Sequence, residues 1–392
     1  RVTDAFNYET EPFISLHLYP VDSTHSDSTI FLKKPFYVTS TLDSVIYNFK
    51  NIRPDTYEII AIKDEARNYL FDQNQDKIGF LERPITLPQD SIVNFRIFKE
   101  TPNLFWSRPF FINKNQIGFG YYGEADPSAI QVKSKVDRNF RYLINKNREM
   151  DTLNFWFRGP DRDSLKVGIK EKDTTKQYTI KFGKVLRDSL VISPITSQTM
   201  GLLDSFKIES NLPLVKIDLD LIKIKGLDSL PVSFKASLDK NYDRLSLFYE
   251  WLPNDDYKIE LLPNALVDFW GSTHDTLRFR AKTKPIEDYG EVILQILRED
   301  QDPFILELVD LDGEAIRRYD EPNELDAFEF KFLRPGKYLF RYNRDNNGNK
   351  KGDTGSYLKK IQPEMVYYSK DTIDLRANWE INQQLRIPSE EP

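Results

Sequence analysis

An all-β protein made of several β-sandwiches is the fold class that the sequence predicts, and three features predict it. Short apolar or alternating runs recur along all 392 residues, and clusters of Asp, Asn, Pro and Gly separate them. Aromatic residues make up 13% of the chain, with 27 Phe and 20 Tyr, and such residues favour strands. No segment carries a sustained apolar stripe at helical spacing with end caps, so we expect few and short helices.

The expected strands extend over the whole chain. Turn signals such as residues 253–256 (Pro-Asn-Asp-Asp) and 310–313 (Asp-Leu-Asp-Gly) separate them, which is typical of sandwiches or small barrels. In chain order, the runs that we expect to form strands are Phe13 to Tyr19, Tyr57 to Ile62, Ile92 to Phe98, Leu153 to Phe157, Leu245 to Trp251, Val292 to Leu297, Phe304 to Val309 and Tyr338 to Tyr342.

Composition excludes several kinds of chemistry. The chain has no cysteine, which excludes thiol nucleophiles, disulfides, zinc–thiolate sites and iron–sulfur clusters. Its 55 basic and 61 acidic residues give a net charge of −6, so nothing general favours nucleic acid as a partner. No apolar run reaches the length of about 18 residues that a membrane-spanning helix needs. The three histidines, His17, His25 and His274, form no metal or catalytic motif, and we expect no enzyme activity.

An internal repeat links the two ends of the chain. Residues 52–57 (Ile-Arg-Pro-Asp-Thr-Tyr) match residues 333–338 (Leu-Arg-Pro-Gly-Lys-Tyr) at an offset of 333 − 52 = 281. In each copy a proline fixes a turn and an aromatic strand follows. The same ungapped offset aligns Phe49 with Phe330, Asp64 with Asp345, Asn68 with Asn349 and Asp72 with Asp353. This series predicts two copies of one β-module flanking different material.

The material between the copies is long enough for two sandwiches of immunoglobulin-like size, about 90 residues each. Turn-rich segments at 193–198 and 282–285 suggest where they end. The expected domains are therefore a β-module over 1–101, a sandwich over 102–196, a second sandwich over 197–284 and the repeated β-module over 285–392.

The loop after the second copy has the side chains of a calcium site. Asp345, Asn347, Asn349 and Asp353 place oxygen ligands at relative positions 1, 3, 5 and 9, which suits Ca²⁺. Position 6 is Lys350 rather than Gly, and no helix pattern flanks the loop. The alternative interpretation is a hairpin loop whose Asp and Asn side chains bond to nearby backbone N–H groups.

The matching loop of the first copy keeps Asp64, Asn68 and Asp72 but has Ala66 in place of one ligand. A purely structural loop is the favoured interpretation here. Calcium bound at either copy would stabilise the loop without doing chemistry.

A run of aromatic residues between positions 106 and 122 predicts a protein contact. Tryptophan and tyrosine anchor interfaces, and the run holds more aromatic rings than one thin sandwich edge needs. The expected contact residues are Trp106, Phe110, Phe111, Tyr121 and Tyr122.

Several segments resemble known modules. Residues 2–20 and 52–80, with "VTDA", "PFISLHLYPVD" and "IRPDTYEIIAIKD", resemble the carboxypeptidase-regulatory or prealbumin-like β-sandwich. Residues 257–279, "YKIELLPNALVDFWGSTHDTLRF", look like a bacterial Ig-like domain of the surface-layer type. The final stretch from "LRPGKYLFRYNRDNNGNKKGDTGSYLKKIQPEMVYY" to "IDLRANWEI" is similar to the C-terminus of Ig-like-domain lipoproteins of the Bacteroidota.

This resemblance implies a tandem array of Ig-like and prealbumin-like sandwiches in an outer-membrane lipoprotein, exposed on the cell surface. Membrane attachment would then require a lipid anchor that the present chain does not contain. The expected role is that of a non-enzymatic scaffold, a subunit of an envelope complex whose partners are other envelope or outer-membrane proteins, such as a complex that assembles or exports outer-membrane proteins. The alternative is a carbohydrate-binding or adhesive module in which aromatic rings stack on sugars. Fold alone does not choose between them.

Overall fold

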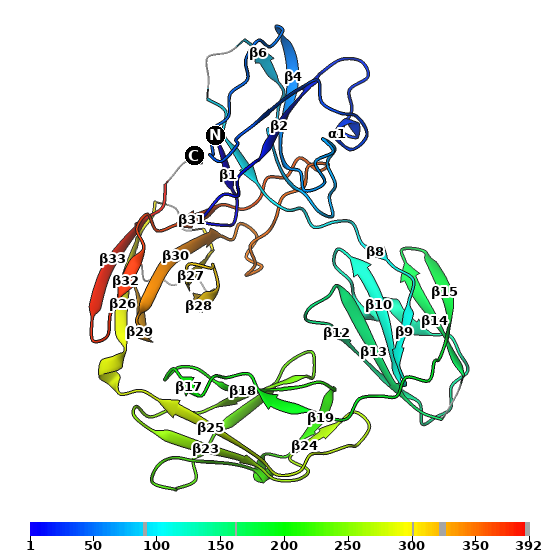
Figure 1. The fold of residues 1–392 in the computed structure, drawn as a ribbon, viewed down its shortest axis with the longest axis vertical. Helices are drawn as coiled ribbons and strands as arrows, with labels where there is room; N and C mark the ends of the chain where they lie inside the picture. Colours follow the sequence, from blue (N-terminus) through cyan, green and yellow to red (C-terminus); the bar gives the residue numbers. More distant parts are fainter. Residues whose placement is uncertain (89–91, 161–162, 300–301, 321–326, 389–392) are drawn as a thin grey trace. The chain divides into compact units, whose positions relative to one another are not determined.

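The computed structural model describes residues 1–392 apart from 89–91, 161–162, 300–301, 321–326 and 389–392. Its regular structure is almost entirely β-strand, so the predicted all-β class is confirmed (Figure 1). Each of the eight runs expected to form a strand overlaps one. In the described residues, helices are limited to α1 (Thr29–Leu32) and the 3₁₀ turns η1 (Pro127–Ala129), η2 (Leu219–Leu221) and η3 (Ile286–Asp288). No helix of this described part is long and apolar enough to cross a membrane.

The chain divides into two compact units. Unit 1 comprises Arg1–Pro102, Glu291–Phe330 and Pro335–Pro392, and unit 2 comprises Asn103–Gly290 with Lys331–Arg334. The chain therefore leaves unit 1 after Pro102, returns to it at Glu291, and contributes Lys331–Arg334 to unit 2 before it ends in unit 1.

The first module of unit 1 is built on the sheet β3-β2-β4-β5, with β6 paired to the beginning of β4 and with β1 and β7 paired in parallel. One face of this sheet packs with β1 and β7 through Leu16, Leu18 and Ile59. The opposite face packs under α1 and the loop after β4 through Ile60 and Ile62. The strands are β1 (Val2–Asp4), β2 (Ser15–Pro20), β3 (Tyr37–Ser40), β4 (Asp55–Lys63), β5 (Lys77–Phe80), β6 (Ile85–Leu87) and β7 (Phe95–Ile97).

The last module has the sheet β28-β27-β30-β31, with β32 paired to the beginning of β30, and a second sheet β29-β26-β33. The two sheets meet through the buried rings of Phe330 on β29 and Phe340 on β30, whose centroids lie 5.2 Å apart. The strands are β26 (Gly290–Leu297), β27 (Phe304–Val309), β28 (Ala315–Tyr319), β29 (Ala327–Leu333), β30 (Gly336–Arg344), β31 (Val366–Tyr368), β32 (Ile373–Leu375) and β33 (Glu380–Arg386).

The sheet topology confirms the predicted repeat. Strand β30 occupies the positions 281 residues after β4, since 55 + 281 = 336 and 63 + 281 = 344. Each is the strand between its antiparallel predecessor, β2 or β27, and its successor, β5 or β31. Each also pairs at its beginning with a further strand, β6 or β32.

The first sandwich of unit 2 consists of the sheet β12-β13-β10-β8, with β9 on β10, and the sheet β11-β14-β15. Its core is rich in aromatic residues, with Phe119 and Phe155 packed in one cluster with Val167. The strands are β8 (Phe105–Trp106), β9 (Phe110–Asn113), β10 (Gln116–Tyr122), β11 (Ile130–Val132), β12 (Arg141–Lys146), β13 (Thr152–Arg158), β14 (Ser164–Glu171) and β15 (Thr174–Lys181).

The second sandwich of unit 2 packs the sheet β16-β18-β22-β21 against the sheet β17-β25-β23-β20. Its core joins Phe206 and Leu245 of the first sheet to Tyr257 and Ile259 of the second. The strands are β16 (Ile192–Pro194), β17 (Thr199–Met200), β18 (Phe206–Ser210), β19 (Leu214–Ile217), β20 (Ile222–Lys225), β21 (Lys235–Leu238), β22 (Arg244–Phe248), β23 (Asp256–Leu261), β24 (Leu266–Asp268) and β25 (Leu277–Thr283).

One expected boundary falls too late. Strand β16 pairs with β18, so residues 192–194 belong to the second sandwich, whereas the expected limit at 196/197 separates them from it. Pro194 and the polar residues after it have the composition of a linker. Because β16 lies at the sheet edge, its last residue needs no ladder donor and a proline fits there.

Candidate functional site

The Asp345–Asp353 loop, which follows β30, is closed by its own hydrogen bonds. The buried Asp345 carboxylate accepts from the backbone N–H groups of Asn349 at 3.0 Å and Lys350 at 2.8 Å. The Asp353 carboxylate accepts from the side-chain amides of Asn347 at 2.5 Å and Asn349 at 2.8 Å. These are the contacts that the hairpin-loop interpretation predicts, in which Asp and Asn side chains bond within the loop.

The loop of the first copy is closed in the same way. Asp64 accepts from the N–H groups of Asn68 at 3.2 Å and Tyr69 at 2.7 Å, and Asp72 accepts from the N–H of Asn74 at 2.9 Å. Within the described residues, no group of three His, Cys, Asp or Glu side chains is arranged to hold a metal ion. Calcium binding at the two loops stays a prediction.

The second loop continues into a hairpin that enters the first module of unit 1. Ser356 and Ile361 form a bridge, and Tyr357 between them is fully buried. The Tyr357 ring belongs to the same apolar cluster as Ile60 and Phe80 of the first module. A side chain from one copy of the repeat therefore completes the core of the other copy.

Polar contacts hold this hairpin in place. The Tyr357 hydroxyl donates to the Glu58 carboxylate at 2.9 Å, and its backbone N–H donates to Glu100. Lys360 forms ion pairs with Asp27 at 3.0 Å and Glu58 at 3.4 Å, and its ammonium group lies 3.8 Å from the centre of the Tyr357 ring. Burial is the largest cause that raises the pKa of Tyr357, so the hydroxyl stays protonated and donates. We call residues 354–362, which include Tyr357, the clasp.

The edges of the clasp bond to the backbone of the first module. Thr354 donates to the carbonyl of Lys99 at 2.6 Å, and Gln362 donates to the carbonyl of Phe80 at 2.9 Å. Sequence reasoning missed the clasp because its partners lie more than 250 positions earlier in the chain. The local signal is an aromatic residue, Tyr357, inside a mostly polar loop.

The expected aromatic contact surface is only partly exposed. Trp106 and Tyr121 are 3% and 4% exposed and lie in the core of the first sandwich of unit 2, so they are corrected from contact to core residues. Alternation along β10 explains this, because Tyr121 lies on the core face and Tyr122 on the opposite one. Tyr122 and Phe105 are 49% and 58% exposed, and their ring centroids lie 6.4 Å apart.

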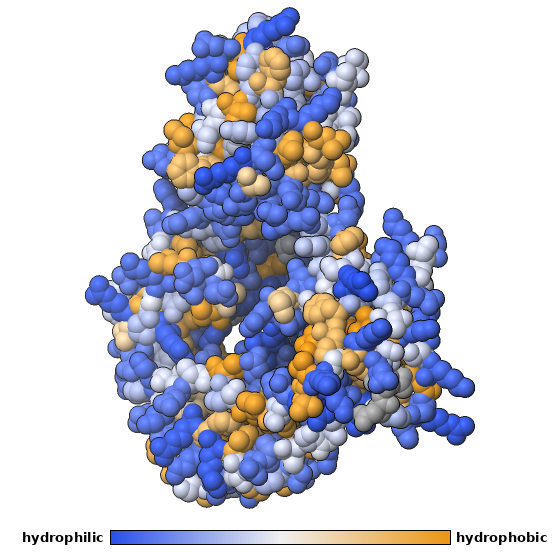
Figure 2. Space-filling model, turned by 45° about the vertical axis from the view of Figure 1, so that its right-hand side comes forward, coloured by the Kyte–Doolittle hydropathy of each residue, from blue (hydrophilic) through white to orange (hydrophobic). Residues whose placement is uncertain are grey.

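The two remaining aromatics of that surface are in contact with their own sandwich. The Phe110 ring lies over Gly118, where an added Cβ would come within 2.5 Å of it, although about half of Phe110 is exposed. Phe111 packs against Phe182 and the core. On the face shown in Figure 2, hydrophilic residues dominate and hydrophobic residues form separate groups.

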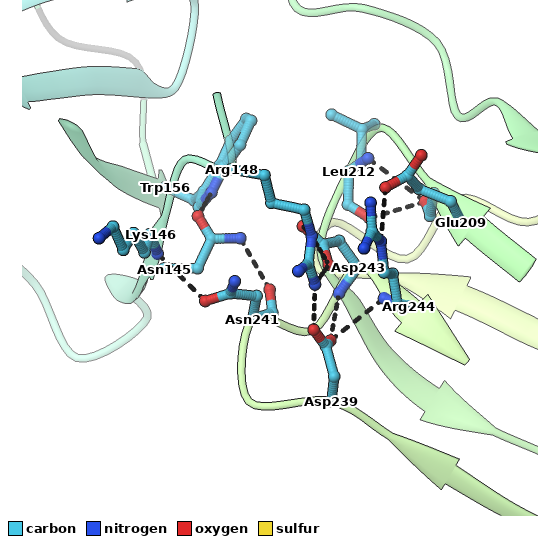
Figure 3. A network of polar contacts seen from close by, with 11 residues as sticks. Asn145, Lys146, Arg148, Trp156, Glu209, Leu212, Asp239, Asn241, Asp243 and Arg244 are labelled. Carbon is cyan, nitrogen blue, oxygen red and sulfur yellow. Dashed lines mark hydrogen bonds and ion pairs between the residues drawn. The ribbon is translucent and has the colours of Figure 1, made fainter. Parts of the chain in front are cut away.

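A joint of polar contacts connects the two sandwiches of unit 2 (Figure 3). Arg148, in the turn after β12, forms ion pairs with Asp239 and Asp243, which lie between β21 and β22. Asn145 donates its side-chain amide to the carbonyl of Asn241 at 2.7 Å. Burial is the largest cause that raises the pKa of Asp243, and hydrogen bonding to Arg148 opposes it.

Apolar packing continues the same joint. Trp156 of the first sandwich clusters with Leu212 and Phe269 of the second, and its ring meets Trp270 edge to face at 5.8 Å. The Trp270 indole N–H donates to the carbonyl of Phe157 at 3.1 Å. The joint therefore combines ion pairs with buried aromatic rings, which restricts relative motion of the two sandwiches.

His17 lies on β2 and is fully buried, and Ser15, two residues earlier, lines a surface hollow of about 740 Å³. Its Nε2 lies 2.8 Å from the Ser15 hydroxyl, and its Nδ1 lies 3.4 Å from the Tyr19 hydroxyl. Burial lowers the pKa of His17 to about 4, with Asp64 acting in the opposite direction. A base with this pKa is poorly matched to proton transfer at neutral pH, so the pair is a weak basis for hydrolysis.

Known proteins resemble this chain only distantly. No family model matches the chain, and no curated protein matches its sequence. Among solved structures it is similar to domains A168–A170 of titin, at 10% identity and a TM-score of 0.19, covering 62% of this chain and 94% of that one. It is also similar to BcpA, the major pilin subunit of Bacillus cereus, at 10% identity and a TM-score of 0.18, covering 98% and 97%. A third is the surface layer protein SbsC, domains 4–9, at 8% identity and a TM-score of 0.21, covering 90% and 57%. Likeness at this level does not extend to activity or role.

Proposed function

We propose that this protein is a non-catalytic structural subunit of a bacterial cell surface, which presents rigid β-sandwich faces to other proteins. In this proposal, the clasp keeps unit 1 closed, and unit 2 carries faces that contact partners. Its partners are envelope or outer-membrane proteins, and its site of action is the outer membrane, on the extracellular side.

The observation that carries the proposal is the clasp. A loop of the last module donates Tyr357 to the core of the first module, so the two ends of the chain fold into one unit. Neighbouring sandwiches that are held by buried rings and ion pairs keep their surfaces in a fixed arrangement. A fixed arrangement favours binding because less conformational entropy is lost on association.

The joint in unit 2 supports the same proposal. Arg148, Asp239 and Asp243 with the Trp156 cluster couple two sandwiches that short linkers alone would leave free to rotate. Charged and aromatic side chains thus stiffen the protein at two separate places, the clasp in unit 1 and the joint in unit 2.

Purification from detergent-solubilised membranes tests the proposal. The tagged chain should recover an envelope protein at a fixed stoichiometry, and so should the Leu358→Ala variant, because Leu358 is an exposed neighbour of Tyr357. The Tyr357→Ala variant should recover less of that protein per chain, because unit 1 is loosened in this variant. Recovery of the wild-type chain alone, from the soluble fraction, contradicts the proposal.

A carbohydrate-binding or adhesive role is the second candidate. The neighbouring rings of Phe105 and Tyr122, both half exposed, are the observation that favours it. The purified chain would then bind glycans on an array, and the Tyr122→Ala variant would not. Equal binding by both proteins, or none by either, excludes these rings as a sugar platform.

A further inference from the structure

One face of the second sandwich of unit 2 carries a concentrated positive charge. On the sheet that contains β20, β23 and β25, the core-facing side chains alternate with exposed ones. Six outward side chains are basic and two are acidic, giving 6 − 2 = +4 on one face of a chain whose net charge is −6. The basic residues are Lys223, Lys225, Lys258, Arg278, Arg280 and Lys282, and the acidic ones are Asp256 and Glu260.

The strand register places like charges directly opposite one another. Lys225 of β20 is paired with Lys258 of β23, and Lys258 is paired with Arg280 of β25. Like charges at directly opposed positions destabilise a sheet. We call Lys225, Lys258 and Arg280 the basic row.

The acidic residues of this face are already engaged. Glu260 forms an ion pair with Arg278 at 2.9 Å, and Asp256 forms one with Lys282 at 3.4 Å. Within the described residues, the basic row and Lys223 have no ion pair. The long side chains of this face border a groove of about 440 Å³. The row therefore keeps a positive charge that no ion pair of the described residues neutralises.

We propose that the basic row, with Lys223, is a docking surface for an acidic, extended segment of a partner protein. This inference rests on the proposed function and names the chemistry of the partner. Residues two apart on one strand are about 6.7 Å apart, and alternate residues of an extended peptide have the same spacing. An acidic residue at every second position would match Lys223 and Lys225 along β20, or Arg278 and Arg280 along β25.

The position of the acidic residues favours a narrow peptide over a membrane surface. Asp256 and Glu260 lie on the same face, within one two-residue step of Lys258 along β23. A broad anionic surface would press against both carboxylates of β23, whereas one extended segment that runs along β20 or along β25 lies to one side of them. The ion pairs of Glu260 and Asp256 would stay intact beside such a segment.

Peptide binding to the purified full chain tests this inference. The probe is a fluorescein-labelled peptide of six Glu-Thr repeats, and its neutral counterpart has six Gln-Thr repeats. Fluorescence anisotropy should show saturable binding of the acidic peptide only, weakened at least about tenfold when salt rises from about 0.05 to about 0.3 M, because salt screens exposed charges.

Two matched triple variants identify the surface. The test variant is Lys225→Gln, Lys258→Gln and Arg280→Gln, and it should bind the acidic peptide at least about tenfold more weakly. The control variant removes three exposed lysines from β14 and β15, which face serine or threonine across the strands, and it should bind within about twofold of wild type. The control substitutions are Lys166→Gln, Lys170→Gln and Lys181→Gln. Equal losses in both variants, or no loss in the test variant, overturn the proposal.

Competing ligands and the membrane purification separate the remaining outcomes. The chain is also offered vesicles that contain anionic phospholipid, and polygalacturonate. If either ligand binds more tightly than the acidic peptide, and the test variant abolishes that binding, the assignment to a protein segment is overturned. If the wild-type chain recovers its envelope partner and the test variant recovers as much, the basic row is excluded while the proposed function stands. If the wild-type chain recovers no partner, the proposed function fails. The peptide measurement still decides whether the basic row binds an acidic segment. Circular dichroism of each variant confirms that it is folded.

Discussion

Removing the Tyr357 ring should loosen the first module of unit 1 although the substitution lies in the last module. A fully buried aromatic ring removes about 150–250 Å² from water, worth about 4–6 kcal/mol as an upper estimate. Truncations of buried aromatic residues to alanine cost about 3–5 kcal/mol. We therefore expect Tyr357→Ala to lower the free energy of unfolding of unit 1 by about 4 kcal/mol.

Two further variants divide this effect. Tyr357→Phe keeps the ring and removes the hydroxyl that donates to Glu58, so it should cost about 1–2 kcal/mol. Glu58 keeps its ion pair with Lys360, which limits the loss. Leu358→Ala truncates an exposed side chain of the same hairpin and should change stability by less than about 0.5 kcal/mol.

Hydrogen exchange read by mass spectrometry is the appropriate assay, because a chain of several domains has no single free energy of unfolding. Peptides that cover β4 and β5 should exchange faster in Tyr357→Ala, while peptides from unit 2 should be unchanged. The reasoning is refuted if β4 exchanges at the wild-type rate in Tyr357→Ala, or if Leu358→Ala accelerates it equally.

Four further predictions follow from individual side chains. His17 has a folded pKa of about 4 against 6.5 unfolded, so the unfolded state binds the proton first and stability decreases as the pH falls below 6.5. Hydrogen exchange of peptides that cover β2, corrected for the intrinsic exchange rate at each pH, should show a loss of about 2 kcal/mol between pH 8 and pH 5 that His17→Gln lacks. Lys258→Glu places an acid between two bases and should raise stability by about 0.5–1 kcal/mol in the same assay, whereas Lys166→Glu should not. Arg148→Ala leaves two carboxylates facing each other and should lower the free energy of unfolding of unit 2 by about 1 kcal/mol after solvent screening, read by hydrogen exchange of unit 2 peptides, with a smaller effect at high salt. The calcium hypothesis for residues 345–353 predicts a higher melting midpoint in calcium than in EDTA, and an unchanged midpoint removes it.

The sequence was sufficient for the strand content and for the repeat because both depend on local patterns. The alternation in residues 57–62 and in residues 338–342 is a property of each strand alone, and both strands formed where they were predicted. The turn chemistry around Pro54 and Pro335 likewise acts over a few residues. The repeat was found because the same local pattern, a proline turn followed by an aromatic strand, occurs twice.

Contacts between distant segments could not be predicted in this way. Nothing near Tyr357 in the sequence specifies that its ring enters a core almost 300 residues away. The hydrophobic effect is non-directional, so an apolar side chain does not determine which core will bury it. The expected protein contact failed at Trp106 and Tyr121 for a related reason, because a dense run of aromatic residues hides which of them face the core. Only the pairing of β10 with β8 and β13 resolves the two faces.

The basic row is the feature that sequence reasoning was least able to find, and this bears on its meaning. Lys225, Lys258 and Arg280 are spread over 56 positions of an acidic chain, and they become neighbours only when two registers are fixed. Once the registers are known, the row contradicts the rule that cross-strand pairs support the sheet. A sequence that agrees with its fold at most levels departs from it chiefly where function requires the departure. If stability alone had shaped this face, an acidic residue at position 258 would satisfy both neighbours at once. The absence of such a residue is the physical reason for expecting the missing negative charge to come from a partner.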